Sequence, residues 1–165
     1  MPRRLEVSFN SPQCGWMSIG FRDAESEFHT TTAHAPHAGA LPELMQALAA
    51  LADADAADGE YTLRWNRDPE EFDFVFRRSG ETLAIEIYQY PTDEREASER
   101  QLVFKHIGSV GDVIAAFSET FDQLYADRDT DEFEFNWRQP FPLAEYTLFK
   151  NRTHQSRGSD ISHHE

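Results

Sequence analysis

The amino-acid sequence predicts an α+β fold, in which an antiparallel sheet of about six strands carries two amphipathic helices on one face and a short C-terminal helix follows. Three consecutive segments in the middle of the chain alternate apolar and polar residues and are joined by tight turns. Two other segments repeat apolar residues every three or four positions. No crossover helix separates the central strands, which disfavours a parallel sheet. At 165 residues, one domain over residues 3–150 is expected.

The first third of the chain predicts three strands and one helix. Residues 5–9 and 17–21 alternate, and a polar extended stretch covers residues 28–32, which together indicate an antiparallel meander. A helix is expected to open at Pro42, which suits a first helical turn, and to stop before Gly59.

The central strands carry the most specific prediction of pairing. A two-residue turn at Ser79-Gly80 would set Phe76 opposite Leu83, Phe74 opposite Ile85 and Phe72 opposite Ile87. A four-residue loop, Arg67 to Glu70, would set Trp65 opposite Phe72 and Leu63 opposite Phe74. A slip of one residue would turn each apolar set to the other face, so this agreement supports the pairing.

The last third predicts a strand at residues 101–107 and then the clearest helix of the chain. Ser109 and Asp112 resemble a capping box ahead of an apolar helical face that continues to Ala126. Apolar residues alternate briefly over residues 133–137, the spacing of an extended segment, and Pro142 opens a short last helix through Phe149. Residues 151–165 are polar and are expected to form a disordered tail.

The polar face of the predicted sheet holds the candidate site residues. The predicted register places Arg64 beside Asp73 and Asp73 beside Glu86. Two neighbouring carboxylates are a candidate general acid and base, but the same row is also an ordinary solvated ladder of charges. Tyr88 and Tyr90 share this face, and they form either a protein-binding patch or a surface covered by the N-terminal strands or the C-terminal segment.

The sequence gives little support for a metal site or for a catalytic nucleophile. His29, His34 and His37 are the one histidine cluster in the folded part, but their spacing matches no zinc pattern, and whether they converge is open. Cys14 is the sole cysteine, so it forms no intramolecular disulfide. Nucleotide-binding, serine-hydrolase and zinc-protease motifs are absent, and we expect no cofactor and no metal.

The charge balance favours some partners and disfavours others. Thirty acidic against 15 basic residues give a net charge of −15, which repels nucleic acid and attracts basic proteins. The same charge also serves solubility. No apolar run approaches the length of a membrane span and no export signal is visible, so the cytoplasm is the expected location. The sequence does not indicate an oligomeric state.

Four short segments resemble a group of small, uncharacterised bacterial proteins. They are Gly15-Trp16-Met17, Leu41-Pro42-Glu43-Leu44, Leu63-Arg64-Trp65 and Asp68-Pro69-Glu70, within residues 5–90. Some of that group are similar to immunity proteins, which bind and neutralise a partner toxin. The resemblance implies a non-catalytic binding role and carries over no functional residue.

Two function hypotheses from different classes follow, with a third, structural one. The leading hypothesis is a non-catalytic acidic protein-binding module of the immunity type, with a basic protein as partner. The alternative is a small hydrolase-like enzyme that uses Asp73 and Glu86, with His29 or His106. The third is a structural domain without a strong partner.

Overall fold

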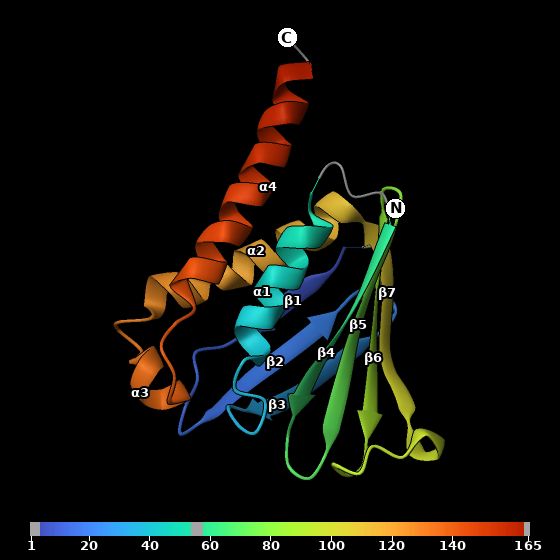
Figure 1. Cartoon of the computed structure of the whole chain (residues 1–165), viewed down its shortest axis with the longest axis vertical. Helices are drawn as coiled ribbons and strands as arrows, with labels where there is room; N and C mark the ends of the chain where they lie inside the picture. Colours follow the sequence, from blue (N-terminus) through green and yellow to red (C-terminus); the bar gives the residue numbers. More distant parts are fainter. Residues whose placement is uncertain (1–3, 54–57, 164–165) are drawn as a thin grey trace.

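The computed structural model describes residues 4–53 and 58–163 of the chain. Within these residues the chain forms seven strands, four α-helices and one 3-10 helix (Figure 1). In chain order they are β1 (Glu6–Phe9), β2 (Trp16–Arg22), β3 (Glu27–Ala33), α1 (Ala40–Leu51), β4 (Asp58–Asn66), β5 (Glu71–Ser79), β6 (Thr82–Tyr90), η1 (Ala97–Glu99), β7 (Gln101–Ser109), α2 (Val110–Asp127), α3 (Phe133–Trp137) and α4 (Leu143–His163).

The strands form two antiparallel sheets, which corrects the prediction of a single sheet of about six strands. The first sheet has the order β1-β2-β3, the predicted meander, and the second has the order β4-β5-β6-β7. Aromatic rings join the two sheets: Phe21 lies 5.8 Å from Phe74 between ring centroids. Alternation in a sequence identifies the apolar face of each strand but not the sheet to which the strand belongs, and the first three strands pack on the second sheet instead of extending it.

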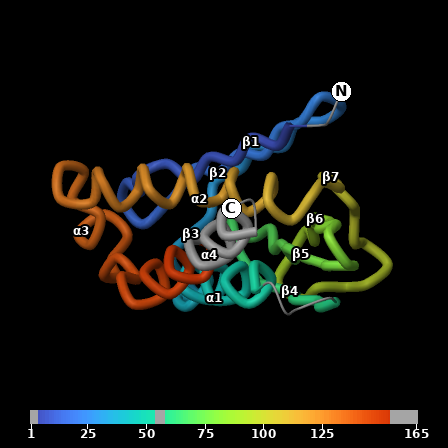
Figure 2. The backbone as a smooth tube through the Cα atoms, turned by 90° about the horizontal axis from the view of Figure 1, so that it is seen from above, coloured from blue at the N-terminus to red at the C-terminus, as the bar shows by residue number. Residues whose placement is uncertain are grey.

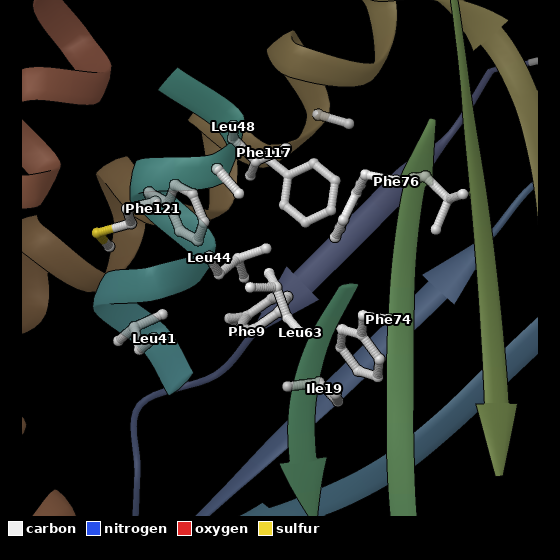
Figure 3. Packing of buried hydrophobic residues seen from close by; sticks show 14 of the residues in the cluster. Phe9, Ile19, Leu41, Leu44, Leu48, Leu63, Phe74, Phe76, Phe117 and Phe121 are labelled. Atoms are coloured by element: carbon white, nitrogen blue, oxygen red, sulfur yellow. The ribbon is translucent and has the colours of Figure 1, made fainter. Parts of the chain in front are cut away.

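The two predicted amphipathic helices bury their apolar sides in one shared core, but they do not lie side by side on one face of one sheet. Helix α1 contacts β4 and α4, whereas α2 contacts β1 and also reaches β6 and β7 (Figure 2). Side chains from both helices and both sheets meet in this core (Figure 3). Those labelled there are Phe9, Ile19, Leu41, Leu44, Leu48, Leu63, Phe74, Phe76, Phe117 and Phe121.

The cap predicted for α2 is confirmed. The backbone N–H of Asp112 donates to the Ser109 hydroxyl at 3.1 Å, and Ser109 has the extended backbone of an N-cap residue. This cap fixes the point at which β7 turns directly into α2.

One of the two predicted hairpin registers is confirmed, and the other is wrong by two residues. Trp65 faces Phe72 and Leu63 faces Phe74, as the four-residue loop predicts. In the next hairpin Phe76 faces Ile85 instead of Leu83. The cause is the turn: Gly80 has φ of +61° and takes the first central position, so that Ser79 pairs with Thr82. A shift of two residues keeps every side chain on its predicted face.

The C-terminal part of the chain contains more helix than predicted. Residues 133–137 form the short helix α3 instead of an extended segment, between Glu132 and Arg138 in the left-handed conformation. Helix α4 does not stop at Phe149 but continues to His163, across most of the segment expected to be a tail. Phe149 and Thr153 on this helix are buried, and Arg152 pairs with Asp53 at 3.0 Å. Residues 164–165 lie outside the described residues.

No helix among the described residues combines the length and the apolar character that crossing a membrane requires.

Candidate functional site

The outer face of the four-stranded sheet carries the predicted residues in a different arrangement from the predicted row. Arg64 faces Asp73, as predicted. Asp73, however, faces Tyr88 and not Glu86, because the β5–β6 register differs by two residues. Glu86 instead faces Val75 on one side and Lys105 on the other. The two carboxylates are therefore not direct cross-strand neighbours.

Glu86 belongs to a network of charges near the middle of the sheet. It is 9% exposed and forms ion pairs with Arg77 and, at 3.8 Å, with Lys105. Arg77 also donates to Glu60 at 2.9 Å. The hydrogen bond to Glu60 and the charge of Glu86 raise the pKa of Arg77 against the opposing effect of burial. In this part of the face, Glu60, Arg77, Glu86 and Lys105 form a ladder of paired charges, the structural alternative given by the sequence.

Asp73 belongs to a second network, which the connection between β6 and β7 completes. Arg95 from that connection forms an ion pair with Asp73 and another, at 3.2 Å, with Glu71. The Tyr90 hydroxyl donates to Asp73 at 3.0 Å. Burial and the nearby Arg64 guanidinium together lower the pKa of Arg95, although Glu71 raises it. Both Asp73 oxygens are thus engaged by other side chains.

The two predicted tyrosines lie under the same connection. The Arg95 guanidinium lies 4.5 Å from the Tyr90 ring centroid, and that of Arg100 lies 3.5 Å from the Tyr88 ring centroid. Tyr90 is only 7% exposed, whereas Tyr88 is half-buried. The cover is therefore the β6–β7 connection, and not the N-terminal strands or the C-terminal segment that were expected.

The three clustered histidines face different partners and do not converge. His29 pairs with Glu27, the ring of His34 lies against Trp137, and His37 Nε2 lies 3.0 Å from Glu71 Oε1. Over residues 4–53 and 58–153, whose side chains the structure describes, no three His, Cys, Asp or Glu side chains are grouped so as to hold a metal ion. His106, named in the enzyme hypothesis, is buried against Asp23. Cys14 is exposed with a free thiol.

A cleft of about 430 Å³ opens where the loops at one end of the two sheets meet. Its volume lies within the range of small-ligand pockets. The lining comes from the start of β2, the end of β3 and the loop after it, the β4–β5 turn with its flanking strand residues, and the β6–β7 connection. These residues are Trp16, Ala33, Ala35, Pro36, Asn66, Asp68, Pro69, Glu71 and Asp93.

The lining of the cleft contains a buried hydrogen-bond acceptor without a partner, beside a carboxylate that is only partly engaged. Asn66 is 3% exposed, and its Oδ1 has no hydrogen-bond partner in the described part of the chain. Glu71, its cross-strand partner, is 4% exposed. His37 and Arg95 both reach its Oε1, and no hydrogen bond from the described residues reaches Oε2. A buried acceptor without a donor is costly, which makes the Asn66 side chain unusual.

Trp16 forms the aromatic part of the cleft, and a tight turn holds it there. Gln13 and Trp16 exchange two backbone hydrogen bonds around Cys14 and Gly15, which have φ of +52° and +84°. Positive φ at both central residues is the type I′ hairpin turn. Gly15 N–H donates to the Asn136 carbonyl, so the turn is anchored on α3. Trp16 itself remains 40% exposed.

Sequence reasoning missed Asn66 and Glu71, because both occupy ordinary positions beside a turn. The predicted and confirmed loop from Arg67 to Glu70 already made them the last facing pair of that hairpin. The signal available in the sequence was that Asn66 and Glu71, both polar, face each other directly beside the Asp68-Pro69 turn.

A second feature at this end of the molecule is a run of carboxylates around α3. We call residues 127–134 the acidic segment; it contains Asp127, Asp129, Asp131, Glu132 and Glu134. None of these five forms an ion pair with a lysine or arginine of the described chain. Phe135 follows directly and is 79% exposed. Two of the carboxylates also line a cleft of about 520 Å³ between β1 and α2.

Comparison of the chain with protein-family models, curated proteins and solved structures finds no match.

Proposed function

We propose that this protein is a non-catalytic acidic module that binds a basic protein, and that its class is the immunity type. The observation that carries the proposal is the acidic segment, whose five carboxylates lack ion-pair partners in the described chain, beside the exposed ring of Phe135. The resemblance within residues 5–90 supports the immunity type, and it includes Trp16 and the Asp68-Pro69 turn of the cleft.

In many protein interfaces, charged groups accelerate association and buried aromatic side chains supply much of the affinity. Carboxylates that are not neutralised within the chain raise the local concentration of a basic partner and accelerate its association. An exposed aromatic ring supplies apolar area that becomes buried on binding. The chain has a net charge of −15, so the molecule as a whole also attracts a positively charged partner.

The enzyme alternative receives less support from the geometry. Asp73 is held by Arg95 and Tyr90, and Glu86 by Arg77 and Lys105. A general acid and base pair needs two groups poised around one reacting atom, with at least one free to take up or release a proton. These two carboxylates instead lie in separate networks of charges.

Affinity capture from a lysate of the source cells, with the whole chain as bait, tests the proposal. We expect a basic protein to be retained at low ionic strength and released by added salt, because salt shortens the Debye length beyond which exposed charges no longer attract one another. Failure to retain any protein at low ionic strength contradicts the proposal. Retention of a toxin domain would identify the immunity type specifically.

A further inference from the structure

We infer that the cleft at Trp16, Asn66 and Glu71 binds the guanidinium group of an arginine side chain supplied by the basic partner. The inference rests on the proposed function and deepens it, because it assigns the partner a residue and the chain a pocket. The occupant follows from the chemistry of the lining residues.

The buried floor of the cleft requires a ligand that donates hydrogen bonds. Asn66 Oδ1 is a buried acceptor without a partner in the described chain, and Glu71 Oε2 receives no hydrogen bond there. Asn66 and Glu71 occupy facing positions of adjacent strands, so their side chains are neighbours on one face. A guanidinium presents several N–H donors in one plane and accepts none, which suits two neighbouring acceptors.

The charge of the cleft requires a cation. Three carboxylates line it, those of Asp68, Glu71 and Asp93, and its lining contains no lysine or arginine. Arg95 reaches Glu71 from outside the lining and offsets one of these charges. Asp68 and Asp93 are left exposed at the rim, so a single positive charge would be bound favourably.

Two further observations favour a guanidinium over a metal ion. Among the side chains that the structure describes, those of residues 4–53 and 58–153, no group of three is arranged to ligate a metal ion. Trp16 places an exposed indole in the lining, and arginine stacks on such rings more readily than a compact cation does. The combination of an aromatic wall, the buried Asn66 oxygen, the neighbouring Glu71 carboxylate and the rim carboxylates matches one arginine side chain.

Nuclear magnetic resonance titration of the whole chain with L-arginine amide tests the cleft without any partner. We expect a saturable shift of the Trp16 indole and Asn66 side-chain amide resonances. L-citrulline amide, of nearly the same shape but neutral, should cause no such shift. Absence of a shift with arginine amide, or an equal shift with citrulline amide, overturns the inference.

Variants locate the binding. Asp93→Asn removes a rim charge from an exposed connection, and Asn66→Leu removes the buried acceptor at similar volume; each should weaken arginine amide binding by about tenfold. Glu99→Gln is the matched control, because Glu99 belongs to the same connection but does not line the cleft. Unchanged affinity in both cleft variants overturns the inference.

The two proposals fail separately. If arginine amide binds the cleft but no basic protein is captured at low salt, the proposed function is contradicted and the cleft assignment stands. If a basic partner binds and Asp93→Asn and Asn66→Leu leave its affinity unchanged, the cleft assignment is contradicted and the proposed function stands.

Discussion

His106 Nδ1 on β7 lies 2.8 Å from Oδ2 of Asp23, which belongs to the turn between β2 and β3, and each side chain is 1% exposed. This pair links the two sheets at a buried position. Burial raises the pKa of Asp23, but the hydrogen bond with His106 and the backbone N–H groups of Glu25 and Ser26 lower it, and the net pKa lies below its ordinary value of 3.8. The ionised carboxylate is therefore the form that the folded chain stabilises.

We predict that Asp23→Asn costs about 1–3 kcal/mol of unfolding free energy at pH 7. Because the pKa of Asp23 is lower in the folded chain, its stabilising contribution is fully present above the ordinary pKa. The contribution is lost as the pH falls through the lowered value. Urea unfolding of the parent and the variant from pH 7 to pH 3 measures this. The difference between them should shrink below about pH 4, whereas Glu99→Gln, at an exposed site, should show little difference at any pH. A difference that grows towards low pH would contradict the assignment.

Arg78 holds the end of α1 to the second sheet, and its removal should be costly. It is 6% exposed, and its guanidinium donates to the carbonyls of Leu51, Asp53 and Gly80 at 2.6, 2.8 and 2.8 Å. We predict that Arg78→Ala destabilises the fold by about 3 kcal/mol, because three backbone carbonyls lose a charged donor, and the hydrogen bond to Leu51 is buried. Thermal unfolding compares it with Arg77→Ala, which removes an exposed partner of Glu60 and Glu86 and should cost about 1 kcal/mol or less. Equal losses of stability in the two variants would contradict the role of the Arg78 hydrogen bonds in holding α1 to the sheet.

Arg95 neutralises two carboxylates of low exposure, so it should contribute more to the stability of the fold than other residues of the β6–β7 connection. Removal in Arg95→Ala leaves Glu71 and Asp73 without their guanidinium partner, and we predict a loss of about 3 kcal/mol in unfolding free energy. Arg100→Ala, which removes a guanidinium from above the Tyr88 ring in the same connection, should cost about 1 kcal/mol. Chemical denaturation of both variants decides this, and a smaller loss for Arg95→Ala than for Arg100→Ala would contradict the network.

Gly15 is required by both its conformation and its surroundings. It has φ of +84°, and a Cβ at this position would lie 2.8 Å from His34 Cδ2. We predict that Gly15→Ala destabilises the chain by about 1–2 kcal/mol and shifts the fluorescence of the adjacent Trp16. Gly111→Ala is the matched control, because apart from its chain neighbours and the backbone of its own helix nothing lies within 4 Å of its Cβ position in α2, and alanine favours a helix. Unchanged stability of Gly15→Ala would contradict the turn geometry.

The sequence predicts those features that depend on local rules. The Ser109 cap, the alternating faces of the strands and the loop from Arg67 to Glu70 all follow from residues close together in the chain. The β5–β6 register was missed because two adjacent two-residue turns, which differ only in the place of Gly80, give the same faces. The predicted neighbourhood of Asp73 and Glu86 depended on that register and is wrong, whereas Arg64 faces Asp73 as predicted.

The candidate cleft could not be predicted because it is assembled from distant segments. Trp16, Asn66 and Asp93 come together only after the first sheet packs on the second and the β6–β7 connection folds back. The pairing of Arg95 with Asp73, 22 residues apart, likewise has no local signature. The helix at residues 133–137 was missed because three alternating apolar residues in five positions do not distinguish a strand from a short helix.

The most direct test of the central claim is low-salt capture by two charge-matched variants. One variant, Asp129→Asn with Glu132→Gln and Glu134→Gln, neutralises exposed residues of the acidic segment. The other neutralises the same number of exposed carboxylates in the β6–β7 connection, by Glu94→Gln with Glu96→Gln and Glu99→Gln. The account predicts that the second variant retains the same basic protein as the parent chain and that the first loses it. Equal retention by both variants would contradict the account.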